Sequence, residues 1–150
     1  MRLFQIEEPD GEPVDPGAAG AAIAIDASST AVEVAFSVGG NALILSDREG
    51  FERVLPVPGI AARKAEWQAM IEAARTRAER SLGRPVTHAV IVLARALDTN
   101  IADRLREAAH DAGLVVLRWA SAAEMPEGSS PALAAAMLAE DLAPPLDRNP

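Results

Sequence analysis

The stretch Asp26-Ala27-Ser28-Ser29-Thr30 places one carboxylate and three hydroxyls within five residues. Alternating apolar residues lie on both sides of it, so we expect a turn between two strands. An acid and hydroxyls in such a turn could contact a phosphate. The same residues could form a plain hairpin, in which Asp26 and Ser28 bond to nearby groups of the turn. The residue types alone leave both interpretations open.

The histidines give weaker signals. His88 lies within the apolar run VTHAVIVLA and is expected to be a packed residue. His110 precedes Asp111 in an expected helix and is expected to face solvent. The two histidines are not at metal-ligand spacing, and the chain has no cysteine, which excludes disulfides and thiolate chemistry. We therefore expect no catalytic residue here.

The two tryptophans have different expected roles. Trp67 falls on the apolar stripe of a helix and is expected in the core. Trp119 follows the expected last strand and is a candidate interface residue, because tryptophan often lies at the centre of protein interfaces. The acidic residues near the end of the sequence form no pair whose geometry the spacing predicts: Glu124, Glu127, Glu140 and Asp141.

Composition narrows the classes of partner. The chain has 150 residues and a net charge of −8, with no basic cluster. Binding to nucleic acid needs Lys and Arg to neutralise phosphates, so no nucleic-acid partner is expected. No apolar run approaches the roughly 20 residues that span a bilayer, and the start of the sequence lacks an apolar signal core. We expect a cytoplasmic protein of one domain, with no membrane partner.

The hydrophobic pattern predicts an antiparallel meander followed by alternating helices and strands. Strand 30–38 is expected to be half-buried, with Val34 on its apolar face and Ser37 on the opposite face. The pair Gly39-Gly40 predicts the second turn. The full set is strands over 21–26, 30–38 and 42–46, a helix over 63–82, a strand over 86–94, a helix over 98–112, a strand over 114–118 and a helix over 131–141.

This order predicts an α/β domain over residues 21–143, with three antiparallel strands, two parallel strands and covering helices. That topology is the ribonuclease-H-like unit, which actin-like ATPases use in two copies. Residues 1–20 are expected to be a flexible leader, and residues 144–150 a disordered tail, because both are rich in Pro and polar residues.

The stretch Arg80–Arg118 resembles the 70-kDa heat-shock chaperones of the DnaK type. Its GRPVTHAVIVLARAL and AGLVVLR segments match the family's G-x-P-V-T-x-A-V-I-T-V-P-A-Y-F and A-G-L-x-V-L-R. AIAIDASSTAVEVAF resembles the family's first phosphate loop, G-I-D-L-G-T-T-N-S. REGFERVLP (Arg48–Pro56) resembles the stretch that leads into the family's L-P-S. The leader Leu3–Pro9 resembles the HscA-type branch, which serves iron–sulfur assembly. The resemblance covers roughly Leu3–Pro58 and Glu66–Arg118.

The resemblance implies a role for the DASST turn. Asp26 matches the family's magnesium-positioning acid, Ser28 matches a glycine, and Ser29 and Thr30 match two threonines. A serine in place of that glycine adds a side chain where the phosphate would approach. The turn is therefore expected to be a vestigial phosphate loop, with ATP and magnesium bound weakly at best.

Other departures bear on activity. Only a few residues separate Pro58 from Glu66, where the family carries a subdomain with its catalytic Lys. The family's P-A-Y-F is Ala94-Arg95-Ala96-Leu97, and no second phosphate loop or second lobe has a counterpart in the sequence. Phosphoryl transfer depends on positioned charge from several such groups, so no ATPase activity is expected.

The sequence then supports three functional hypotheses. The first is a non-catalytic interaction module that binds a protein partner or forms a homodimer, linked to chaperone or iron–sulfur assembly systems. The second is a weak Mg·ATP-binding protein that completes its site with a second chain. The third is a decayed gene product.

Overall fold

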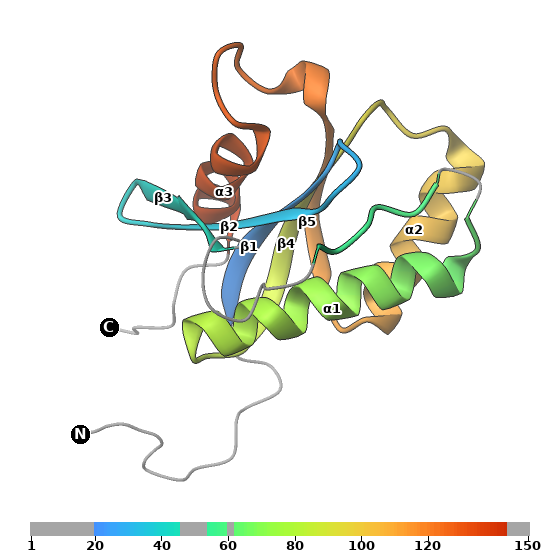
Figure 1. Ribbon diagram of the computed structural model, residues 1–150, viewed down its shortest axis with the longest axis horizontal. Helices are drawn as coiled ribbons and strands as arrows, with labels where there is room; N and C mark the ends of the chain where they lie inside the picture. Colours follow the sequence, from blue (N-terminus) through green and yellow to red (C-terminus); the bar gives the residue numbers. More distant parts are fainter. Residues whose placement is uncertain (1–19, 46–53, 60–61, 144–150) are drawn as a thin grey trace, which may run out of the picture.

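The computed structural model describes residues 20–45, 54–59 and 62–143 (Figure 1). The expected leader, apart from Gly20, and the expected tail lie outside the described residues. So do residues 46–53 and 60–61, which include much of the stretch that resembles the approach to the family's L-P-S.

A mixed five-stranded sheet forms the centre of the domain. Its strands lie in the order β3-β2-β1-β4-β5. β1 pairs antiparallel with β2, and β2 pairs antiparallel with β3, whereas β1, β4 and β5 run parallel. The bounds are β1 Ala21–Ala27, β2 Glu33–Val38, β3 Asn41–Ile44, β4 Val86–Leu93 and β5 Val115–Ser121.

Helices cover both faces of this sheet. α1 (Lys64–Leu82) and α2 (Thr99–Asp111) pack together on one face of the sheet. α3 (Pro131–Leu142) covers the opposite face (Figure 1). The strand order and the antiparallel β2 are those of the ribonuclease-H-like unit, so the expected fold class is confirmed.

The face under α1 and α2 is built from large apolar side chains. Ile23, Ile25 and Ile91 of the sheet are at most 1% exposed and pack with Trp67 of α1 and Leu105 of α2. Full burial of one such side chain contributes about 1.5–3 kcal/mol. Trp67 is 2% exposed, as its place on the α1 stripe predicts.

The face under α3 is built from small side chains. Ala24 and Ala35 of the sheet meet a row of alanines on α3, and none of them is exposed. Alanine keeps the helix backbone close to the strands, so α3 lies across β1, β2 and β4. The helical row is Ala132, Ala135, Ala136 and Ala139.

Three expectations about the strands are wrong. β2 begins at Glu33 rather than at residue 30, and it is not half-buried: Ala35 is 0% exposed and Ser37 is 3% exposed. The reason is α3, which covers the face that the alternation assigned to solvent. β5 continues to Ser121 rather than ending at Arg118, so Trp119 lies within the strand and not after it. The strand's own register explains this, since Trp119 pairs with Ile91 of β4.

The predicted turn glycines and helix-end residues are confirmed. Gly39 and Gly40 have φ of 61° and 82°, the backbone that a tight hairpin turn requires. The Asp98 side chain accepts a hydrogen bond from the Ile101 backbone N–H at 3.0 Å and caps α2. Gly83 ends α1 in the left-handed conformation.

Candidate functional site

The acid of the DASST turn lies at the carboxyl end of β1, inside the sheet. Asp26 is in register with Glu33 of β2 and with Val92 of β4, and it is 6% exposed. Carboxyl ends of parallel strands are the edge at which α/β domains bind ligands. The fold therefore places this acid at the correct edge for a ligand site.

Local bonds already engage the Asp26 carboxylate. Its Oδ1 accepts hydrogen bonds from the Ser28 backbone N–H at 3.0 Å and from the Ser28 Oγ–H at 2.5 Å. Both bonds lie within one turn, as in the plain-hairpin interpretation. Ser29 and Thr30 are exposed beyond this closed turn. Binding of phosphate or magnesium by these four residues stays a prediction.

A neighbouring extended segment holds the far side of the turn. The Val57 N–H donates to the Thr30 carbonyl at 3.0 Å, and the Val32 N–H donates to the Leu55 carbonyl at 2.8 Å. Pro56 forms an isolated bridge with Ala31. Among the described residues, these bonds join the segment to the turn between β1 and β2, and its prolines limit the ladder that it can form.

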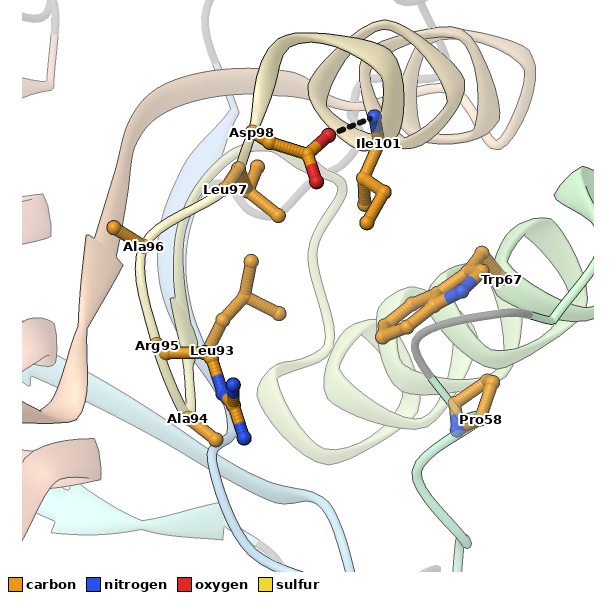
Figure 2. Close-up of a pocket in the computed structure, with 9 residues that line it drawn as sticks. All are labelled: Pro58, Trp67, Leu93, Ala94, Arg95, Ala96, Leu97, Asp98 and Ile101. Atoms are coloured by element: carbon orange, nitrogen blue, oxygen red, sulfur yellow. Dashed lines mark hydrogen bonds between the residues drawn. The ribbon is translucent and has the colours of Figure 1, made fainter.

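A hollow opens at the same edge, on the side of α1 and α2. We refer to it as the Trp67 pocket; its volume is about 440 Å³. Leu93 is in register with Ala27, so the pocket begins beside the end of β1. Figure 2 shows the indole of Trp67 reaching from α1 towards the loop that joins β4 to α2. The lining residues are Pro58, Trp67, Leu93, Ala94, Arg95, Ala96, Leu97, Asp98 and Ile101.

Two charged side chains line this pocket, and one of its lining residues carries a buried polar atom. Asp98 is engaged as the α2 cap. Arg95 is exposed and makes no hydrogen bond or ion pair within residues 20–45, 54–59 and 62–143. The Trp67 Nε1–H is buried and has no acceptor in that same part of the chain. A smaller hollow of about 190 Å³ shares Arg95 and reaches Trp119.

A second open hollow lies between α3 and the segment that precedes it. We refer to it as the α3 groove; its volume is about 680 Å³. Met137 is 47% exposed within it, and Met125, Leu133 and Leu138 are half-buried. The composition of residues 124–130, EMPEGSS, indicates an exposed loop but gives no sign that the loop forms one wall of a groove.

The charges of the α3 groove are mostly negative. The Arg118 guanidinium, bonded at 2.9 Å, and the Ser121 backbone and hydroxyl groups hold the pKa of Glu124 below its usual value. Asp141 also lines the groove and makes no ion pair within the described residues. Glu124 thus neutralises Arg118, and Asp141 gives the groove a net negative charge.

The histidines lie where the sequence places them. His88 is half-buried in β4, with its Nδ1 2.7 Å from the Thr87 Oγ1, and burial lowers its pKa. The His110 side chain is 86% exposed. In the part of the chain that the structure describes, no three His, Cys, Asp or Glu residues are grouped so that they could hold a metal ion.

Trp119 is half-buried and packs against the core beneath α2. An interface role for this residue stays a prediction.

Glu140 has a role that sequence reasoning missed. Its carboxylate accepts hydrogen bonds from the Ser37 hydroxyl at 2.8 Å and from the backbone N–H groups of Gly39 and Gly40 at 2.6 and 3.1 Å. The bond from Ser37 is the main reason that the pKa of Glu140 is lowered. About a hundred residues separate the partners, so no local spacing could reveal the contact.

Comparisons with known proteins show a distant structural similarity and no family or curated match. No family model matches the chain, and no curated protein matches it. Among solved structures, the ethanolamine utilization protein EutJ from Carboxydothermus hydrogenoformans is similar at 13% identity, with a TM-score of 0.45. The match covers 73% of this chain and 39% of EutJ. Separately, no helix within the described residues is long and apolar enough to cross a membrane.

Proposed function

We propose that this chain is a non-catalytic relative of the ATPase lobe of DnaK- and HscA-type chaperones, and that it acts as a protein-interaction module. The main support for an interaction role is the α3 groove. It would take an apolar segment with basic flanks from a partner protein, in a chaperone or iron–sulfur assembly system.

The resemblance to the chaperones supports the lineage. The matching stretch Arg80–Arg118 forms one continuous unit, from the end of α1 through β4 and α2 into β5. The ungapped match therefore spans a complete crossover of the sheet rather than scattered loops. The remaining support comes from the groove itself.

The groove has the chemistry of a peptide site. Methionine adapts to differently shaped apolar partners, and Met125 and Met137 lie in it together. An apolar stripe of a helix or extended segment could cover Leu133 and Leu138 as well. Burial of exposed Met137 against a partner would remove apolar surface from water, which is the main driving force for association.

Charge favours a basic partner over a second copy of this chain. Asp141 lines the groove, Glu127 lies on the adjacent exposed loop, and the whole chain carries −8. Two copies joined through this face would bring like charges together, which opposes association. Lys or Arg beside an apolar stripe would complement the same charges.

A synthetic amphipathic helix of Leu and Lys tests this proposal by isothermal titration calorimetry. We expect saturable binding that weakens about tenfold in Met137→Ser, equal to about 1.4 kcal/mol. Val54→Ser is the matched control, because Val54 is 75% exposed outside the groove. Equal binding of a Leu–Glu helix, or equal binding by Met137→Ser, would contradict the proposal. So would a dimer in sedimentation velocity that Met137→Ser dissociates, because a second copy would then be the occupant.

Weak binding of Mg·ATP is the second candidate, favoured by the position of Asp26 at the carboxyl end of β1. Thermal unfolding with millimolar Mg·ATP tests it. A ligand at a hundredfold excess over its Kd stabilises by about 2.7 kcal/mol, a shift of several degrees for a domain of this size.

The closed Asp26–Ser28 turn leads us to expect no shift from Mg·ATP in the natural sequence. Ser28→Gly removes the hydroxyl that bonds to Asp26 and tests whether that side chain is the obstacle. A shift in the natural protein that disappears in Asp26→Asn would establish nucleotide binding and make this candidate the better one.

A further inference from the structure

We infer that the Trp67 pocket is a binding site for a small monocarboxylate with an aromatic or branched apolar body. This site is separate from the α3 groove and does not depend on the function proposed above.

The apolar wall sets the body of the ligand. Trp67, Leu93 and Ile101 face one hollow from α1, β4 and α2 (Figure 2). A volume of about 440 Å³ lies in the lower part of the range of about 300–1,000 Å³ that is usual for small-molecule sites. The pocket therefore suits one ring or a short branched chain rather than a nucleotide.

Arg95 sets the charge of the ligand. Its guanidinium lines the hollow and has no counter-charge within the described part of the chain. An exposed arginine beside an apolar wall can form paired hydrogen bonds with a carboxylate while the apolar body of the ligand stays in contact with the wall.

Asp98 does not reverse this preference. Its carboxylate accepts the Ile101 N–H and lies at the positive end of α2, so its charge is already compensated. A cationic ligand would have to compete with that cap. A carboxylate meets the free Arg95 instead.

The indole of Trp67, which lines the pocket, provides a reporter of binding. Its Nε1–H is buried without an acceptor among the described residues, although buried donors are nearly always bonded. A ligand seated against the indole would change the surroundings of this N–H. The indole N–H resonance should then move on binding.

The experiment is a titration of the ¹⁵N-labelled protein with 4-phenylbutyrate, followed by two-dimensional NMR. The Trp67 indole N–H and the amides of 94–97 should shift together and saturate. Trp119→Phe assigns the two indole signals. The neutral 4-phenylbutanamide and the cationic 4-phenylbutylamine share the ring and linker, and both should bind at least tenfold more weakly.

Arg95→Gln should weaken 4-phenylbutyrate at least tenfold, whereas Arg84→Gln should not, because Arg84 is exposed on the turn between α1 and β4, outside the pocket. The spectrum itself reports whether each variant is folded. Absence of saturable shifts, unchanged affinity in Arg95→Gln, or equal affinity for the amine would each overturn the inference. None of these outcomes bears on the α3 groove.

Discussion

Two turns of this domain are each stabilised by hydrogen bonds to one carboxylate side chain. The Asp26 carboxylate bonds to the residue two positions later in the chain, and Glu140 bonds to a turn about a hundred residues earlier. From residue types alone, the bond between Asp26 and Ser28 was one of two interpretations of the turn, a plain hairpin or a phosphate-binding turn. The bond could be foreseen because its partners are close in sequence. Residue types gave no sign of the Glu140 contact, because only the packing of α3 brings Glu140 to the Gly39-Gly40 turn.

Removal of the Ser28 hydroxyl should weaken the DASST turn. Ser28→Ala keeps the backbone N–H bond to Asp26 and loses the Oγ bond. We expect about 1 kcal/mol lower free energy of unfolding by urea denaturation, since one bond to a charged group is lost. Ser29→Ala, at an exposed position of the same turn, should change it by less than about 0.5 kcal/mol.

Glu140 should make stability depend on pH. Its pKa is lowered in the folded protein, so its contribution is complete above its ordinary pKa of 4.5 and is lost as pH falls through the lowered value. Glu140→Gln removes the charge. The gap in melting temperature between the natural protein and this variant should be widest near about pH 6 and should shrink towards about pH 3. A gap that stays constant over that range would show that the carboxylate charge is not what stabilises the turn.

At the scale of elements, α3 covers the face of β2 that the sequence pattern assigned to solvent. The period-two pattern of β2 indicated one buried face, and the alanine run of α3 indicated a helix, but neither pattern showed that one covers the other. Ala35 and Ser37 are buried as a result. A buried face made of alanine and serine looks the same in sequence as an exposed one, so this part of the fold could not be predicted.

The close contact between α3 and the sheet should tolerate no added volume. Ala136 is 0% exposed and belongs to the cluster that includes Ala24 and Ala35. Ala136→Leu should lower the free energy of unfolding by about 1–3 kcal/mol, because extra methylenes strain a packed core. Met137→Leu, one position along and exposed, is the control and should be nearly neutral. An Ala136→Leu protein as stable as the natural one would mean that α3 can move outward without loss.

At the scale of the whole molecule, the predicted topology is confirmed, while the two hollows were not predicted. Helix stripes, the glycine turns and the apolar run of β4 each follow from local pattern, and together they predict three antiparallel strands followed by parallel crossovers. The Trp67 pocket joins a residue of α1 to the loop after β4, and the α3 groove joins α3 to its preceding loop. Such hollows depend on the distances between packed elements, which local periodicity does not contain.

One side chain links three elements and should contribute to global stability. Arg75 of α1 donates to the Ala112 carbonyl at the end of α2 at 2.8 Å and pairs with Glu79, which accepts the Val86 N–H of β4. Arg75→Met keeps much of the apolar stem and removes the donors. We expect a loss of about 1–2 kcal/mol in urea unfolding.

The matched control for Arg75→Met is Arg106→Met. It breaks an exposed ion pair with Asp103 and should cost less than about 0.5 kcal/mol. Equal effects of the two substitutions would mean that the link between α1, α2 and β4 adds nothing beyond a surface pair.

The position of α3 at the end of the described chain has a consequence for biosynthesis. All five strands leave the ribosome before Pro131, so Ala24, Ala35, Val90 and Val92 have no helix to cover them at that stage. The domain can complete only one of its two faces until α3 has been synthesised. A nascent chain that stalls before α3 would present an open apolar sheet, a surface that chaperones and proteases recognise. Quality control should therefore act more strongly on chains whose translation stops between β5 and Pro131 than on chains that include α3.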